Sequence, residues 1–135
     1  MRPELHDQFV SLLNERVRFA LPLARYTSFR IGEPTTLEEL RTLLALLHTE
    51  NLPFFLLGGG TNILVSDKGV RGVVIKLGDG FHYACWAEQG DTAVVKVGAA
   101  NSLGRFVREA VRKGYQGMEF AEGIPGSVGG GLLMN

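Results

Sequence analysis

The sequence predicts one domain in which helices cover a sheet that contains both parallel and antiparallel strands. The 135 residues are 45% hydrophobic, which is enough apolar material for one core. A helical pattern at residues 36–48 runs directly into an apolar strand at 52–57, an order typical of layered helices and strands. Strands at 82–88 and 92–97 flank a glycine-containing turn as a hairpin. The hairpin argues against a purely parallel sheet, and hence against an ordinary dinucleotide-binding fold.

The first elements expected are a covering helix and an extended segment. Apolar residues recur at helical spacing between Leu5 and Leu13, so a short amphipathic helix is predicted there. The aromatic and β-branched residues of Arg25–Gly32 favour an extended chain, with Arg30 pointing away from its apolar neighbours. A surface arginine is the simpler interpretation of Arg30, and a ligand contact is the alternative. Glu33-Pro34 then breaks the segment.

The helix at residues 36–48 has a clear start and a clear apolar face. Thr36 and Glu39 form the pattern of a capping box, and Asn51 is a suitable stop. The expected apolar stripe consists of Leu37, Leu40, Leu44 and Leu47. The apolar runs that follow, up to Leu57 and from Ile63 to Val65, are short and flanked by breakers. We therefore interpret them as buried strands.

Between these two runs lies Gly58-Gly59-Gly60-Thr61-Asn62, which we call the glycine-rich loop. Backbone without side chains lets a ligand approach the amide N–H groups, and successive N–H groups in a turn form a concave site that suits a phosphate. Thr61 and Asn62 add polar side chains at the rim. Three glycines alone are equally compatible with a tight turn and with a phosphate loop.

The second half of the chain repeats the alternation of strands, small-residue loops and helices. A strand is expected at Gly72–Leu77, and the small-residue loop 98–102 follows the hairpin. A helix with one apolar face is predicted over residues 103–113, capped by Asn101 or Ser102. The loop could contact a ligand, but a plain strand-to-helix turn explains it equally well.

The residues at the end of the chain provide the strongest motif. Pro125 fixes a turn, Ser127 can cap a following helix, and Gly129, Gly130 and Gly131 leave that helix without side chains on one face. A glycine costs a helix about 1 kcal/mol relative to alanine, so three in a row suggest that something approaches this backbone. The unpaired N–H groups of a helix N-terminus suit a pyrophosphate, which points to a bound nucleotide.

Composition excludes several other classes of protein. Lys+Arg and Asp+Glu balance at 14 each, so nothing suggests a nucleic-acid or membrane partner. The single cysteine, Cys85, cannot form an internal disulfide, which fits a reducing cytoplasm. Three scattered histidines make a metal site unexpected. His82, Cys85 and Trp86 are interpreted as sheet residues without a catalytic partner. No signal peptide or apolar stretch of membrane-spanning length is visible.

Four segments in order resemble the N-terminal part of the UDP-N-acetylenolpyruvoylglucosamine reductase family of flavoenzymes. They are YTSFRIG (Tyr26–Gly32), LGGGTNILVSDKGVRGVVI (Leu57–Ile75), VGAANSLGRFV (Val97–Val107) and GMEFAEGIPGSVGGGLLMN (Gly117–Asn135). The second and fourth segments are long and specific. The broader superfamily of FAD-linked oxidases shares the glycine loop only in outline.

The resemblance implies an α+β FAD-binding domain of the FAD-linked-oxidase type, with two small subdomains, mixed sheets and the cofactor between them. Residues 1–135 would form this domain, and the substrate-binding domain would lie outside the chain. The cofactor-binding residues would be Leu57, Gly58, Gly59, Gly60, Thr61, Asn62, Ile63, Ala99, Ala100, Asn101, Glu122, Gly123, Ile124, Pro125, Gly126, Ser127, Gly129 and Gly130.

The resemblance also implies a reaction. In the family, NADPH reduces FAD, the reduced flavin passes a hydride to an enolpyruvyl double bond, and a serine protonates the neighbouring carbon. The product is UDP-N-acetylmuramate, a peptidoglycan precursor. The expected setting is cytoplasmic and monomeric, with a nucleotide-sugar substrate that binds through the other domain.

The chain departs from the family pattern in two places. About one strand is missing between Gly32 and Glu33, either by deletion or by omission from the sequence. A deletion would expose a sheet edge. The chain also stops at Asn135, before the family's proton-donating serine, so no catalytic residue is assigned and Ser127 is not that serine. These 135 residues are expected to bind FAD weakly and to catalyse nothing. The alternatives are an FAD-binding subunit of another FAD-linked oxidase or dehydrogenase, and a non-catalytic nucleotide-binding or structural fragment.

Overall fold

The computed structural model describes residues 3–24, 27–66 and 69–134, with only the main chain of residues 18–24 and 27–31. The chain divides into two compact units. Unit 1 consists of residues 1–57 and 63–78, and unit 2 consists of residues 58–62 and 79–135. The expected α+β class is confirmed, because each unit combines helices with its own sheet.

Unit 1 is built on a four-stranded mixed sheet with the order β1-β2-β4-β3. Its strands are β1 (Val17–Ala24), β2 (Thr27–Gly32), β3 (Phe54–Leu57) and β4 (Val73–Lys76). The β1–β2 pair is antiparallel, whereas β4 lies parallel to both β2 and β3. Arg25, Tyr26 and the side chain of Arg30 lie outside the described residues, so the interpretation of Arg30 stays a prediction.

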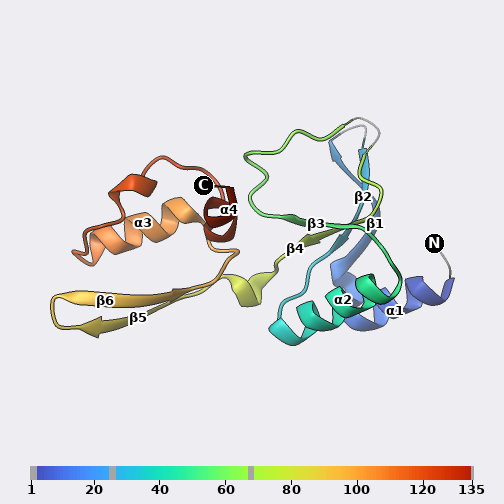
Figure 1. Ribbon diagram of the computed structural model, residues 1–135, viewed down its shortest axis with the longest axis horizontal. Coiled ribbons are helices and arrows are strands. Elements are labelled where there is room, and N and C mark those ends of the chain that lie inside the picture. Colours follow the sequence, from blue (N-terminus) through green and yellow to red (C-terminus); the bar gives the residue numbers. More distant parts are fainter. Residues whose placement is uncertain (1–2, 25–26, 67–68, 135) are drawn as a thin grey trace. The chain divides into compact units, whose positions relative to one another are not determined.

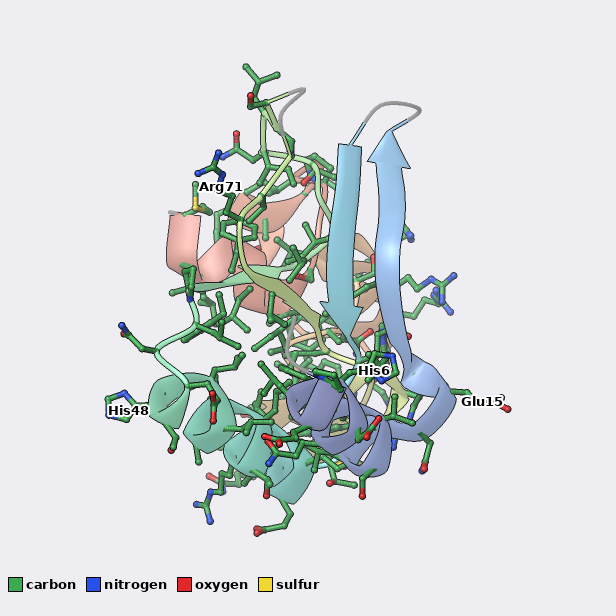
Figure 2. All side chains as sticks on the ribbon, turned by 90° about the vertical axis from the view of Figure 1, so that its right-hand side faces the viewer. His6, Glu15, His48 and Arg71 are labelled. Atoms are coloured by element: carbon green, nitrogen blue, oxygen red, sulfur yellow. The ribbon has the colours of Figure 1, made fainter. Side chains whose placement is uncertain are left out.

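Two helices, α1 (Pro3–Leu13) and α2 (Leu37–Thr49), complete unit 1. Figure 2 shows them side by side at one end of the strands, with Glu15 and His48 extending outward. The core consists of α1 and α2 residues packed on β4: Leu5, Phe9, Leu13, Leu43, Leu47, Val73 and Ile75. A short 3-10 turn, η1 (Asn14–Arg16), joins α1 to β1.

At the start of α2, one of the two hydrogen bonds of the expected capping box is present and the other is replaced. Thr36 Oγ1 accepts a hydrogen bond from the Glu39 N–H at 3.1 Å, as expected. The Glu39 carboxylate, however, accepts from the Thr35 N–H at 2.7 Å and from Arg16 Nη2 at 2.6 Å. Glu39 therefore joins the start of α2 to η1. The prediction that Leu37 belongs to the buried apolar stripe is wrong. This residue is 58% exposed, because it precedes the first turn of α2 that packs on the core.

The prediction of two buried strands around the glycine-rich loop is wrong on two counts. β3 exists, but it forms an edge of the sheet, and Phe54, Phe55 and Leu56 are 48%, 43% and 47% exposed. Ile63–Val65 forms no strand, and Leu64 is fully exposed. Apolar composition alone does not decide whether a run obtains a neighbouring strand.

Unit 2 packs a helix on a hairpin, as Figure 1 shows for α3 and the β5–β6 pair. The predicted hairpin is confirmed, with β5 (Ala84–Gln89) antiparallel to β6 (Thr92–Val97). The first strand begins at Ala84, so the interpretation of His82 as a sheet residue is wrong. α3 (Leu103–Arg112) begins at its cap Ser102 and is followed by Gly114 at φ 83°. The remaining elements are the 3-10 turns η2 (Asp79–Phe81) and η3 (Glu119–Ala121), and the seven-residue helix α4 (Val128–Met134).

An aromatic cluster joins β5 to α3. The Trp86 ring stacks on Tyr115 with centroids 5.5 Å apart and lies 5.6 Å from Phe106. Its Nε1 donates to Glu109 Oε1 at 2.7 Å, and Lys113 Nζ lies 5.5 Å from the ring. Trp86 is thus a structural sheet residue, as expected. No helix in the described chain is long and apolar enough to cross a membrane.

Candidate functional site: a cradle of bare backbone in unit 2

The glycine-rich loop and the end of the chain lie together within unit 2, as the sequence predicted. A Cβ added to Gly59 would lie 2.8 Å from Gly126 Cα, and one added to Gly58 would lie 2.7 Å from Ser127 Oγ. Thr61 Oγ1 also donates to the Pro125 carbonyl at 3.3 Å. The loop therefore packs directly on residues 123–131, which we call the C-terminal segment.

The small-residue loop 98–102 is fixed to the same segment by main-chain hydrogen bonds. The N–H of Val128 donates to the Asn101 carbonyl at 2.8 Å, and that of Gly129 to the Ala99 carbonyl at 2.9 Å. In the opposite direction, the Leu103 N–H donates to the Gly126 carbonyl at 3.0 Å. Three separate stretches of the sequence thus form one cradle.

The glycines of α4 are explained by packing of the protein on itself. A Cβ on Gly129 would lie 2.9 Å from Ala99 Cβ, and one on Gly131 would lie 3.0 Å from Leu103 Cδ2. Packing of the protein therefore explains Gly129 and Gly131 without a ligand, and the contact of this segment with a cofactor stays a prediction. The close neighbours are residues of loop 98–102 and the start of α3, which the spacing of the glycines could not reveal.

The available N–H donors lie in the glycine-rich loop rather than at the start of α4. The N–H groups of Val128 and Gly129 are used by loop 98–102, and that of Gly130 donates to Ser127 Oγ at 3.2 Å. The expectation of unpaired N–H groups at this helix end is therefore wrong. By contrast, the amides of residues 59–62 donate to no acceptor within the described chain. These four successive N–H groups are free to meet an anion.

The remaining predicted site residues divide into supporting and peripheral positions. The Ala100 N–H donates to the Phe81 carbonyl at 3.1 Å, and the side-chain Nδ2 of Asn101 donates to the Tyr83 carbonyl at 3.2 Å. Ile124 packs against the core of unit 2, whereas Glu122 is exposed. Gly123 has φ 76° and open space where a Cβ would lie.

Leu57 and Ile63 are the two predicted site residues that belong to unit 1. Leu57 packs beside Val74 in that unit, and Ile63 is 43% exposed. Gly98 belongs to the cradle but is not among the predicted site residues. It must be glycine, because a Cβ there would overlap the Phe81 carbonyl. The available signal was a glycine directly between a strand and a small-residue loop.

The cradle contains no lysine or arginine. Across the glycine-rich loop, loop 98–102 and residues 122–131, Glu122 is the one charged side chain. An anion bound here would therefore be held by main-chain donors rather than by cations. Within the described residues, no cluster of three or more His, Cys, Asp or Glu side chains could hold a metal ion.

The pKa values that the structure shifts belong to groups outside the cradle. Hydrogen bonding to Arg16 lowers the pKa of Glu39 to about 2, although its partial burial opposes this. Burial raises the pKa of Tyr115, and the nearby Glu88 carboxylate adds to the effect.

A glycine-rich loop with free amides on an α+β scaffold is the arrangement expected of a domain that binds a nucleotide diphosphate. The sequence model of the family described as "FAD binding domain" matches residues 30–135, so the chain belongs to this family. FAD is thus the cofactor of the class. The cradle has features that suit a diphosphate, because bare backbone and N–H groups without an acceptor in the described residues coincide there.

Curated relatives and a solved structure similar to this chain are named as UDP-N-acetylenolpyruvoylglucosamine reductases. The UDP-N-acetylenolpyruvoylglucosamine reductase 2 of Symbiobacterium thermophilum is 46% identical over 127 residues, covering 89% of this chain and 40% of that protein. The reductase of Syntrophus aciditrophicus is 40% identical, covering 98% of this chain and 46% of that protein. The crystal structure of the Thermus caldophilus reductase MurB matches with TM-score 0.59 and 33% identity, covering 85% of this chain and 40% of that one.

The chain spans less than half the length of these relatives. The alignment with the Syntrophus protein runs over 146 residues although this chain has 135, so that relative contains residues that this chain lacks. In the structure, β2 ends at Gly32 and α2 begins at Leu37. The missing strand between Gly32 and Glu33 stays a prediction.

Proposed function

We propose that residues 1–135 form the FAD-binding portion of an NADPH-dependent reductase that converts UDP-N-acetyl-enolpyruvylglucosamine to UDP-N-acetylmuramate. When bound, FAD would supply hydride transfer from NADPH to the enolpyruvyl double bond. The proposal is supported by the family match, by the reductase names of the relatives, and by the cradle.

One observation carries the assignment of roles: the N–H groups of residues 59–62 have no acceptor among the described residues, and the loop packs on the C-terminal segment. In this proposal Gly58–Asn62 hold the diphosphate, and residues 123–130 line the other side of the cofactor. Ala99–Asn101 support that segment through the hydrogen bonds described above. The function of these residues is to bind and orient the cofactor.

The proposal assigns no catalytic residue to this chain. The nucleotide-sugar substrate would bind through a domain outside these 135 residues. We propose a cytoplasmic monomer that contributes to peptidoglycan synthesis, and through it to cell shape and division. No nucleic-acid or membrane partner is part of the proposal.

Two measurements on the purified chain test the proposal. FAD is titrated into the protein and binding is followed by quenching of flavin fluorescence, with riboflavin as the matched ligand that lacks the diphosphate. We expect weak but saturable binding of FAD and much weaker binding of riboflavin. Equal binding of both, or no binding, would contradict the diphosphate assignment. NADPH oxidation that depends on the enolpyruvyl substrate is expected to be absent, and robust turnover would refute the absence of a catalytic role.

A further inference from the structure

The side chain of Thr61 ties the glycine-rich loop to the C-terminal segment. Its Oγ1 donates to the Pro125 carbonyl at 3.3 Å, across 64 residues of sequence. A threonine hydroxyl has one proton, and here that proton is used within the protein. None is left to donate to a phosphate oxygen, so the hydroxyl can influence an anion chiefly through the position of the loop.

A second contact lies on the other side of Gly60. Gly59 packs against the main chain of Gly126, at a distance that leaves no space for a Cβ. Gly60, at φ 71°, is therefore fixed between a packing contact and a hydrogen bond. The loop amides have no acceptors in the described chain. These two contacts consequently determine where the amides point.

The position of Thr61 is in turn limited by Gly126. A Cβ on Gly126 would lie 3.0 Å from Thr61 Oγ1, and Gly126 has φ 119°, a conformation that favours glycine. Pro125, with its φ fixed by the ring, presents the carbonyl that Thr61 reaches. The hydrogen bond thus depends on Gly126, which leaves space for the threonine side chain, and on Pro125, which supplies the acceptor.

We propose that Thr61 is a positioning residue that holds the glycine-rich loop in its anion-binding conformation before the cofactor arrives. The inference rests on the proposed function for the identity of the ligand, but the preformed loop is a property of the free protein. An ordered loop loses less conformational entropy on binding, so the hydroxyl strengthens binding without touching the ligand.

The test compares three variants of the full 135-residue chain. Thr61→Val keeps the branched shape and removes the hydroxyl, whereas Thr61→Ser keeps the hydroxyl. Thr92→Val is the matched control, because Thr92 Oγ1 also donates to a main-chain carbonyl in unit 2, that of Gln89 at 3.0 Å, in the hairpin turn. Backbone order parameters from ¹⁵N relaxation are measured on the FAD-free proteins, and FAD affinity is measured by fluorescence quenching.

We expect Thr61→Val to lower the order parameters of residues 59–62 in the free protein, from values near 0.85 toward about 0.6. We expect the Kd for FAD to rise about three- to tenfold, the effect of losing one neutral hydrogen bond. Thr61→Ser should restore both quantities, and Thr92→Val should change neither.

Unchanged loop order in free Thr61→Val would overturn the inference, and so would a loss of order that extends over the whole of unit 2. Lowered loop order with an unchanged Kd would also overturn it. If the wild-type chain bound no FAD, the proposed function would fail, and the order parameters would still decide whether Thr61 orders the loop.

Discussion

Gly59→Ala is the substitution that should affect the cradle most directly. The added Cβ would lie 2.8 Å from Gly126 Cα, 3.3 Å from Gly126 C and 3.4 Å from Ser127 N. All three neighbours are main-chain atoms, so no side-chain rotation can relieve the overlap. The loop and the C-terminal segment must instead move apart by roughly 1 Å to reach ordinary contact distances.

The energetic consequence follows from the cost of overpacking. Forcing one extra methyl group into a tight contact costs about 1–3 kcal/mol. If the cradle binds the cofactor only in its closed form, that cost appears in binding, and the Kd for FAD rises about five- to 150-fold. The free protein can relax by opening the loop. The thermal midpoint of Gly59→Ala should therefore fall only slightly, while its Kd for FAD rises.

Gly104→Ala provides a control for which the thermal midpoint is expected to rise rather than fall. Gly104 lies in α3 of the same unit, and the nearest atom to its added Cβ is Arg108 Nη1, at an ordinary 3.5 Å. Alanine favours a helix over glycine by about 1 kcal/mol, so this variant should unfold at a higher temperature and bind FAD as the wild type does.

The assay is a fluorescence titration of FAD into wild type, Gly59→Ala and Gly104→Ala, with thermal unfolding recorded by circular dichroism. A wild-type Kd for Gly59→Ala would refute the reasoning, because it would mean that the contact with Gly126 does not shape the binding site. A large fall in the thermal midpoint with no specific loss of affinity would equally contradict it.

Three further outcomes are expected. Hydrogen bonding to Arg16 keeps the pKa of Glu39 near 2, below its ordinary 4.5. The stabilisation from this ion pair is therefore complete above about pH 4.5 and is lost as the pH falls toward 2. In urea titrations, the free energy of unfolding of Glu39→Gln should be lower than that of the wild type by about 1 kcal/mol at pH 7, after allowance for solvent screening, and by a smaller margin at pH 3. Trp86→Phe loses the hydrogen bond to Glu109 and should cost about 1–2 kcal/mol in the free energy of unfolding, measured by circular dichroism in urea. Salt should affect FAD binding only weakly, because no cationic side chain lies in the cradle; a Kd that rises steeply between low and moderate ionic strength would contradict this.

Helix caps and the hairpin turn were predicted correctly from short patterns in the sequence. Thr36 caps α2, Ser102 caps α3, and Gly90 occupies the hairpin turn at φ 61°, all near the expected positions. Each of these features depends on a few neighbouring residues. The recognition of the glycine-rich loop and the C-terminal segment as partners rested on a longer match between motifs.

The errors concern properties that depend on distant parts of the chain. The burial of Phe54 and Phe55 depends on whether β3 has a neighbour on both sides, which its own composition does not reveal. Gly129 and Gly131 were interpreted as leaving room for a ligand, whereas Ala99 and Leu103 lie beside them. A run of glycines reports that something comes close, but it does not identify what comes close.

The exposed edge at β3 has a consequence for how this chain behaves in solution. One side of β3 carries main-chain groups without a strand partner in the described sheet, and its aromatic side chains are about half exposed. Such an edge can accept a strand from another molecule and so seed aggregates. Concentrated preparations should scatter light increasingly with time, and a lysine placed at Phe55 should suppress that growth while leaving unit 2 intact.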